Sequence, residues 1–135
     1  MNILVIDAQG GGLGRQLIKA VREKLPEARI TAVGTNSVAT AAMLKEGADM
    51  AATGENAVKV AAEEADVIMG PVGICIADAM GGEITKKMAV AVGRSRARRI
   101  LIPFQNCNTY IAGVGSGKTA QLIADAVGEL TRQQV

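Results

Sequence analysis

Length, composition and charge describe one domain and exclude several kinds of chemistry. The 135 residues are enough to bury roughly two thirds of the unfolded surface, so we expect a single domain spanning residues 1–135. The chain contains no histidine, which excludes a Ser-His-Asp triad, a Cys-His dyad and imidazole-based zinc sites. Only Phe104 and Tyr110 are aromatic, which argues against base stacking, and the net charge of +2 indicates no class of partner.

The sequence predicts a cytoplasmic protein that binds neither membrane nor nucleic acid. Cys75 and Cys107 are too few for a disulfide framework and fit a reducing compartment. Residues 1–7 enter a strand directly, without the charged segment of a leader peptide. No apolar run approaches the roughly 18 residues that span a bilayer.

Apolar runs of strand length alternate with segments of helical period along the chain. The first strand, Asn2–Asp7, is almost continuously apolar, which is typical of a central strand covered on both faces. A helix is expected over residues 14–25, where Pro26 follows its end. The next expected elements are a strand over 29–35, a helix from Asn36 or Ser37 to Glu46, an edge strand at Met50–Thr53 and a helix over 56–65.

The second half of the chain continues the alternation around one long connection. Strands are expected over 66–70 and 99–104, and helices over 84–97 and 117–130. Between the last two strands, Val72, Ile74, Ile76 and Met80 form an apolar piece too short for a crossover helix. We expect this piece to be exposed, and therefore predict a homo-oligomer that uses it or the helix after it.

Strand–helix alternation predicts right-handed βαβ units and a parallel sheet. The predicted fold class is α/β: a single doubly wound, three-layer, Rossmann-like domain with about five parallel strands. The favoured strand order is 3-2-1-4-5, and the flavodoxin-like order 2-1-3-4-5 is the alternative.

The candidate site lies at the carboxyl ends of the strands, where such sheets bind ligands. The strongest signal is the glycine-rich loop after the first strand, with four glycines in the five residues 10–14. Glycines allow the backbone to approach a phosphate, and the N-terminus of the helix beginning at Gly14 favours an anion. A purely structural turn is the alternative, because a carboxylate at Asp7 would repel a pyrophosphate unless a cation bridged them.

Small or hydrogen-bonding residues follow the other strands as well. The ligand's remainder has two possible directions, toward Thr35 and Asn36 or toward the ends of the fourth and fifth strands, and the second offers more polar groups. The candidate binding residues are Asp7, Gln9, Gly10, Gly11, Gly12, Leu13, Gly14, Thr35, Asn36, Gly70, Pro71, Asn106 and Asn108. No metal site is predicted, and the catalytic residues, if there are any, are unknown.

Two nucleotide motifs are only partly matched. The loop fits the T-G-x-x-x-G-x-G pattern of short-chain dehydrogenases at Gly12 and Gly14, but Asp7 and Ala8 replace its Thr and Gly, and Tyr110 lacks a lysine four residues on. No acidic residue closes the second strand to hold an adenosine ribose, so the neutral donors Thr35 and Asn36 would tolerate a 2′-phosphate or make no ribose contact.

A Walker-like segment, AGVGSGKT at residues 112–119, does not directly follow a strand, so we interpret it as the entry to the last helix. The basic run Arg94, Arg96, Arg98 and Arg99 is interpreted as the cationic end of a helix rather than a nucleic-acid patch.

Several segments together resemble one family. VIDAQGGGLG, AVGTNSVATAAMLKEGAD, ATGEN, GPVGI, GEITKKMA and ILIPFQNCN are similar to small Rossmann-like proteins catalogued as domain of unknown function 3842, over residues 1–114. The resemblance implies a fold and no activity.

The leading functional hypothesis is a sensor or regulatory module that binds a nucleotide, such as NAD(P), or another phosphate-bearing small molecule. One alternative is an enzyme acting on a nucleotide or phosphorylated substrate, with Asp7 as acid, base or metal ligand. The other alternative is an interaction protein whose glycine loop is vestigial.

Overall fold

Five parallel strands form a single sheet in the order β3-β2-β1-β4-β5. The computed structural model describes residues 1–103, 108–115 and 117–132. The predicted fold class and the favoured strand order are confirmed, and the flavodoxin-like order is excluded. The strands are β1 (Asn2–Asp7), β2 (Arg29–Gly34), β3 (Met50–Thr53), β4 (Val67–Pro71) and β5 (Arg98–Ile102).

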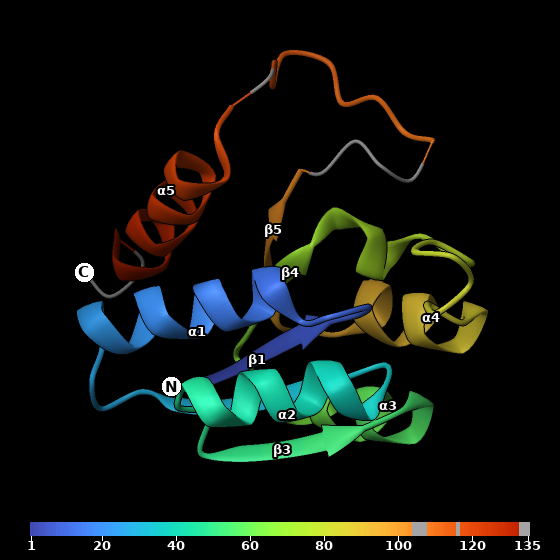
Figure 1. The fold of residues 1–135 in the computed structure, drawn as a ribbon, viewed down its shortest axis with the longest axis horizontal. Coiled ribbons are helices and arrows are strands. Elements are labelled where there is room, and N and C mark those ends of the chain that lie inside the picture. Colours follow the sequence, from blue (N-terminus) through green and yellow to red (C-terminus); the bar gives the residue numbers. More distant parts are fainter. Residues whose placement is uncertain (104–107, 116, 133–135) are drawn as a thin grey trace.

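Helices cover both faces of the sheet and make the three layers (Figure 1). Side chains of α1, α2 and α5 share one core with Ile3 and Val5 of β1, whereas side chains of α3 and α4 share the other core with Leu4 and Ile6. Successive residues of a strand point to opposite faces, so β1 supplies both cores. The helices are α1 (Gly12–Lys24), α2 (Ser37–Glu46), α3 (Glu55–Glu64), η1 (Val72–Cys75), α4 (Lys86–Arg94) and α5 (Thr119–Arg132).

Element boundaries differ from the expected ones where a cap decides them. Helix α1 begins at Gly12, two residues earlier than expected, because Gly11 takes a left-handed conformation and serves as the N-cap. Helix α4 begins only at Lys86, because the Thr85 hydroxyl caps it by accepting from the amide of Met88. In the part of the chain that the structure describes, no helix has the length and apolar character needed to cross a membrane.

The apolar piece after β4 is not the exposed patch that we expected. The 3-10 turn η1 folds this piece back onto the sheet, where Ile74 is 1% exposed and belongs to the core under α3 and α4. Ile76 and Met80 are half-buried against the same core. The segment therefore leaves none of its four apolar side chains fully exposed, Val72 also being half-buried, and the homo-oligomer itself stays a prediction.

We had expected the basic run to form the cationic end of one helix, but its residues belong to two different elements. Arg94 is the last residue of α4, but Arg98 and Arg99 belong to β5, and Arg98 forms an ion pair with Glu129 of α5. The Arg99 guanidinium nevertheless reaches the end of α4 and donates to the Ser95 carbonyl at 2.9 Å. Part of the run is thus used to satisfy the free carbonyl groups of this helix.

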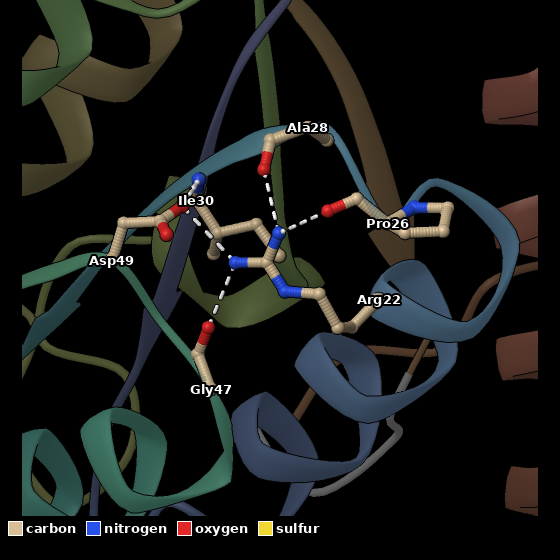
Figure 2. Close-up of polar contacts among 6 residues, drawn as sticks. All are labelled: Arg22, Pro26, Ala28, Ile30, Gly47 and Asp49. Carbon is tan, nitrogen blue, oxygen red and sulfur yellow. Dashed lines mark hydrogen bonds and ion pairs between the residues drawn. The ribbon is translucent and has the colours of Figure 1, made fainter.

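At the amino-terminal edge of the sheet, Arg22 fastens three segments together (Figure 2). Its guanidinium donates at 2.7–3.1 Å to the carbonyl oxygens of Pro26, Ala28 and Gly47 and to the carboxylate of Asp49. The same Asp49 oxygen accepts from the Ile30 amide at 2.8 Å. That amide bond, followed by the Arg22 contact, lowers the pKa of Asp49.

We predict that Arg22→Lys lowers the free energy of unfolding by about 1–3 kcal/mol, because an ammonium group cannot serve four acceptors arranged around a planar guanidinium. Urea unfolding measures the loss, with Arg15→Lys, an exposed position on the same helix, as the matched control. Equal stability of the two variants would contradict the proposed role of this network.

Candidate functional site

A cavity of about 240 Å³ lies at the carboxyl edge of the sheet, on the glycine-rich loop. It is lined by residues that sequence analysis selected and by four that it did not. The predicted residues are Asp7, Gln9, Gly10, Gly11, Gly12, Leu13 and Pro71, and the residues not foreseen are Ala8, Gln16, Met80 and Thr119. Thr119 is the first residue of α5, so the Walker-like segment enters a helix, as interpreted, and that helix reaches the cavity.

The glycines of the loop divide into two kinds. A Cβ on Gly11 would lie 2.9 Å from the backbone of Ala39, and a Cβ on Gly14 would lie 2.5 Å from the Met43 sulfur, so both glycines allow α1 to pack closely. A Cβ on Gly10 or on Gly12 would meet no atom of the described residues within 4 Å. Gly10 and Gly12 therefore leave open space on the cavity side of the loop, which packing alone does not require.

Asp7 is buried beneath this loop, with 5% of its surface exposed. One carboxylate oxygen accepts from the Ala8 amide at 2.8 Å, and the other accepts from the Gly14 amide at 2.7 Å. Burial raises the pKa of Asp7 and outweighs the two backbone hydrogen bonds, which lower it. The Gly14 amide, which we expected to face a phosphate, is thus already bonded to the protein's own carboxylate.

A second carboxylate, Glu83, closes the side of the site toward β2. One of its oxygens accepts from the amide of Gln9 at 2.9 Å, the hydroxyl of Thr35 at 2.6 Å and the side-chain amide of Asn36 at 2.8 Å. These bonds, with Thr35 first, lower the pKa of Glu83. We call this arrangement the Glu83 clasp.

The clasp corrects the interpretation of the β2 end. Thr35 and Asn36 are not free neutral donors, because both are bonded to Glu83, and a ligand 2′-phosphate there would meet a carboxylate. Sequence reasoning missed Glu83 because this residue lies in the long connection after β4 and not at the end of a strand. The only available signal was an acidic residue directly after the Gly81-Gly82 pair.

Gly70 and Asn108, which were also predicted as binding residues, do not line the cavity. Gly70 is a packing glycine, since a Cβ there would lie 2.4 Å from the Ile6 carbonyl oxygen. Asn108 is exposed and does not line the cavity. Asn106 and Cys107 lie outside the described residues, and Cys75 is half-buried in η1, where burial raises the pKa of its thiol.

The backbone is strained at the cavity wall. Gln9 and Met80 both have positive φ, at 53° and 56°, although neither is glycine, and both line the cavity. Such conformations are costly and persist where the surrounding structure fixes them, often at functional sites. Among the described residues that line the cavity, Asp7 is the only one with an ionisable side chain.

These features define a Rossmann-like α/β protein with an open glycine-loop cavity at the carboxyl edge of its sheet. The chain belongs to the family described as "Domain of unknown function (DUF3842)", whose model matches residues 2–134. No curated protein matches the chain.

A solved structure with the same fold is described as a dodecameric FMN-dependent Ubix-like decarboxylase from Escherichia coli O157:H7. The two chains are 17% identical, the match covers 98% of this chain and 94% of that chain, and the TM-score is 0.52. A likeness at this identity shows the shared fold alone.

We predict that Glu83→Ala lowers the free energy of unfolding by about 1–2 kcal/mol at neutral pH, because three donors lose a charged acceptor at a half-exposed position. Since the folded state lowers the pKa of Glu83, the stabilising effect is present above the unfolded pKa and is lost as the pH falls through the folded pKa. Chemical unfolding across the acid range measures both effects.

The matched control is Glu64→Ala, at an exposed position near the end of α3. A Glu83→Ala variant that is as stable as this control at neutral pH would show that the clasp contributes nothing to the fold.

Proposed function

We propose that this protein binds a phosphate-bearing small molecule in the glycine-loop cavity, as a sensor or regulatory module. The observation that carries the proposal is the open space at Gly10 and Gly12, directly at the N-terminus of α1. Free amide groups and the positive end of the helix dipole favour an anion at such a position. The strained backbone at Gln9 and Met80 supports the same location.

The Glu83 clasp favours a ligand that places no adenosine ribose at the end of β2. A dinucleotide on this fold extends its adenosine ribose toward the end of the second strand, where Thr35 and Asn36 are already bonded. The open direction runs past Pro71, Met80 and Thr119. FMN carries one phosphate and no adenosine, and the solved neighbour is described as FMN-dependent, so FMN is the first ligand to test.

Binding is proposed rather than catalysis because of Asp7. Both of its oxygens accept hydrogen bonds from backbone amides, so neither is aimed as a base at a ligand, and no other described side chain in the cavity wall is ionisable. We also retain the proposal of a homo-oligomer, for which the neighbour's dodecameric description gives a precedent, and light scattering tests it.

We predict that FMN at about 100 times its dissociation constant raises the free energy of unfolding by about 2.7 kcal/mol. We expect Gly12→Ala and Gly12→Asp to fold, because a Cβ at this position meets no described atom within 4 Å. Both will lose the stabilisation by FMN, because the new side chain fills the space of the phosphate or repels it. Thermal unfolding with and without FMN, NAD, NADP, ATP and sugar phosphates measures the effect.

The matched control is Gly93→Ala, which also has open space around the new Cβ but lies on α4, away from the cavity. A Gly12→Asp variant that folds and keeps the full response to a ligand would remove the loop from the binding site. The absence of any response to all these ligands would overturn the proposal of a phosphate site.

The buried carboxylate makes anion binding depend on pH. An anion above the loop further disfavours ionisation of Asp7, whose pKa burial already raises, so binding takes up protons. We predict that affinity for sulfate, which stays a dianion except in strong acid, rises as the pH falls through the raised pKa of Asp7. Asp7→Asn will flatten this dependence, whereas the exposed control Glu64→Gln will retain it, and calorimetric titration at each pH measures both. If sulfate affinity depends on pH in the same way in both variants, Asp7 is not the group whose protonation is linked to binding.

A further inference from the structure

A groove of about 630 Å³ runs between α3 and α4, separate from the glycine-loop cavity. Its floor is apolar and includes Ala62, Val90 and Ala91. Val90 is 43% exposed although it lies at the centre of the groove lining on α4. Each helix contributes residues spaced three or four apart, so the groove follows the two helix axes.

Hydrogen bonds fasten the helices at both ends of this groove. The Thr85 hydroxyl, at the start of α4, donates to the carboxylate of Glu55 in the first turn of α3 at 2.6 Å. The Ser95 hydroxyl, at the end of α4, donates to the carbonyl of Ala62 at 2.6 Å. The spacing of the two helices is therefore set before any partner binds, which reduces the entropy lost on binding.

The rim of the groove is basic, and its positive charges are not neutralised by ion pairs among the described residues. Lys59, Lys86, Lys87 and Arg94 line it together with one acidic residue, Glu63. All five side chains are exposed, and within the described ranges none of them takes part in an ion pair. An apolar floor between unpaired cations is complementary to a surface that is apolar along its centre and acidic along its sides.

We propose that the α3–α4 groove binds an acidic amphipathic helix of a partner protein. Helices of this kind place an apolar stripe at positions i, i+3 or i+4, and i+7 into a groove of matching width. The nine residues of α4 extend roughly 14 Å, which accommodates about two to three turns of the incoming helix. The inference does not depend on the phosphate site, because none of the described residues lines both the groove and the glycine-loop cavity.

A second copy of this chain fits the groove less well. A symmetric pair that met through this surface would place the same basic rim against itself, and like charges across an interface cost binding energy. Nucleic acid would leave the apolar floor unused, and the described residues that line the groove include no aromatic side chain to stack bases.

The test uses the full chain and a synthetic helical peptide, with leucines at helical spacing and glutamates on both flanks. Fluorescence anisotropy measures its binding, and amide chemical shifts locate it. We expect the shifts to fall on α3 and α4, and the double variant Lys87→Glu/Arg94→Glu to weaken binding by about tenfold or more. The control Lys19→Glu/Lys45→Glu changes the net charge equally at exposed positions on α1 and α2, and it should bind as the parent does.

A second variant, Val90→Ser, tests the apolar floor without changing charge and should weaken binding as well. The proposal fails if a peptide with lysine in place of glutamate binds equally, if the groove and control variants lose affinity alike, or if the shifts map elsewhere. It also fails if an RNA oligonucleotide displaces the acidic peptide from the groove, or if light scattering shows a dimer that Lys87→Glu/Arg94→Glu dissociates.

Discussion

The candidate site depends on one buried carboxylate. The Asp7 carboxylate accepts hydrogen bonds from the amide of Ala8, directly after β1, and from the amide of Gly14, in the first turn of α1. It thereby holds the two ends of the glycine-rich loop together. Both ends of the loop are thus held by Asp7, whereas a Cβ on Gly10 or Gly12 would meet no described atom within 4 Å. The negative charge of Asp7 already interacts with the positive end of the α1 dipole. An external anion must therefore bind to the other amides of the loop and must tolerate the charge of this carboxylate nearby.

A second carboxylate decides the direction in which a ligand can extend. Glu83 reaches from the long connection after β4 and bonds the ends of β1 and β2 together. The position that supports an adenosine ribose in dinucleotide-binding proteins is thus filled by contacts within the chain. On the other side, Pro71, Met80 and Thr119 line the cavity, which the described residues leave open. Two acidic residues therefore shape a site whose proposed ligand is an anion, and together they favour a compact ligand with a single phosphate.

The sequence predicted the architecture because its signals were local. Continuous apolar strands that alternate with helices led directly to the parallel sheet, and the glycine loop could be assigned to its edge from position alone. Three features could not be predicted, because each depends on segments that meet only in the folded chain. They are the Glu83 clasp, the Arg22 network and the burial of Ile74. Glu83 lies 47 and 48 residues from its side-chain partners. The sequence pattern also could not distinguish the packing glycines Gly11 and Gly14 from the open glycines Gly10 and Gly12.

The most direct test of this account is a titration of the ¹⁵N-labelled protein with FMN, followed through its backbone amide signals. The account predicts that the signals of Gly10, Gly12 and Leu13 shift with the added ligand. The signals of Thr35 and Asn36 should change little, because the Glu83 clasp keeps the ligand away from β2. Saturable shifts centred on Thr35 and Asn36, with the glycine loop unaffected, would contradict it.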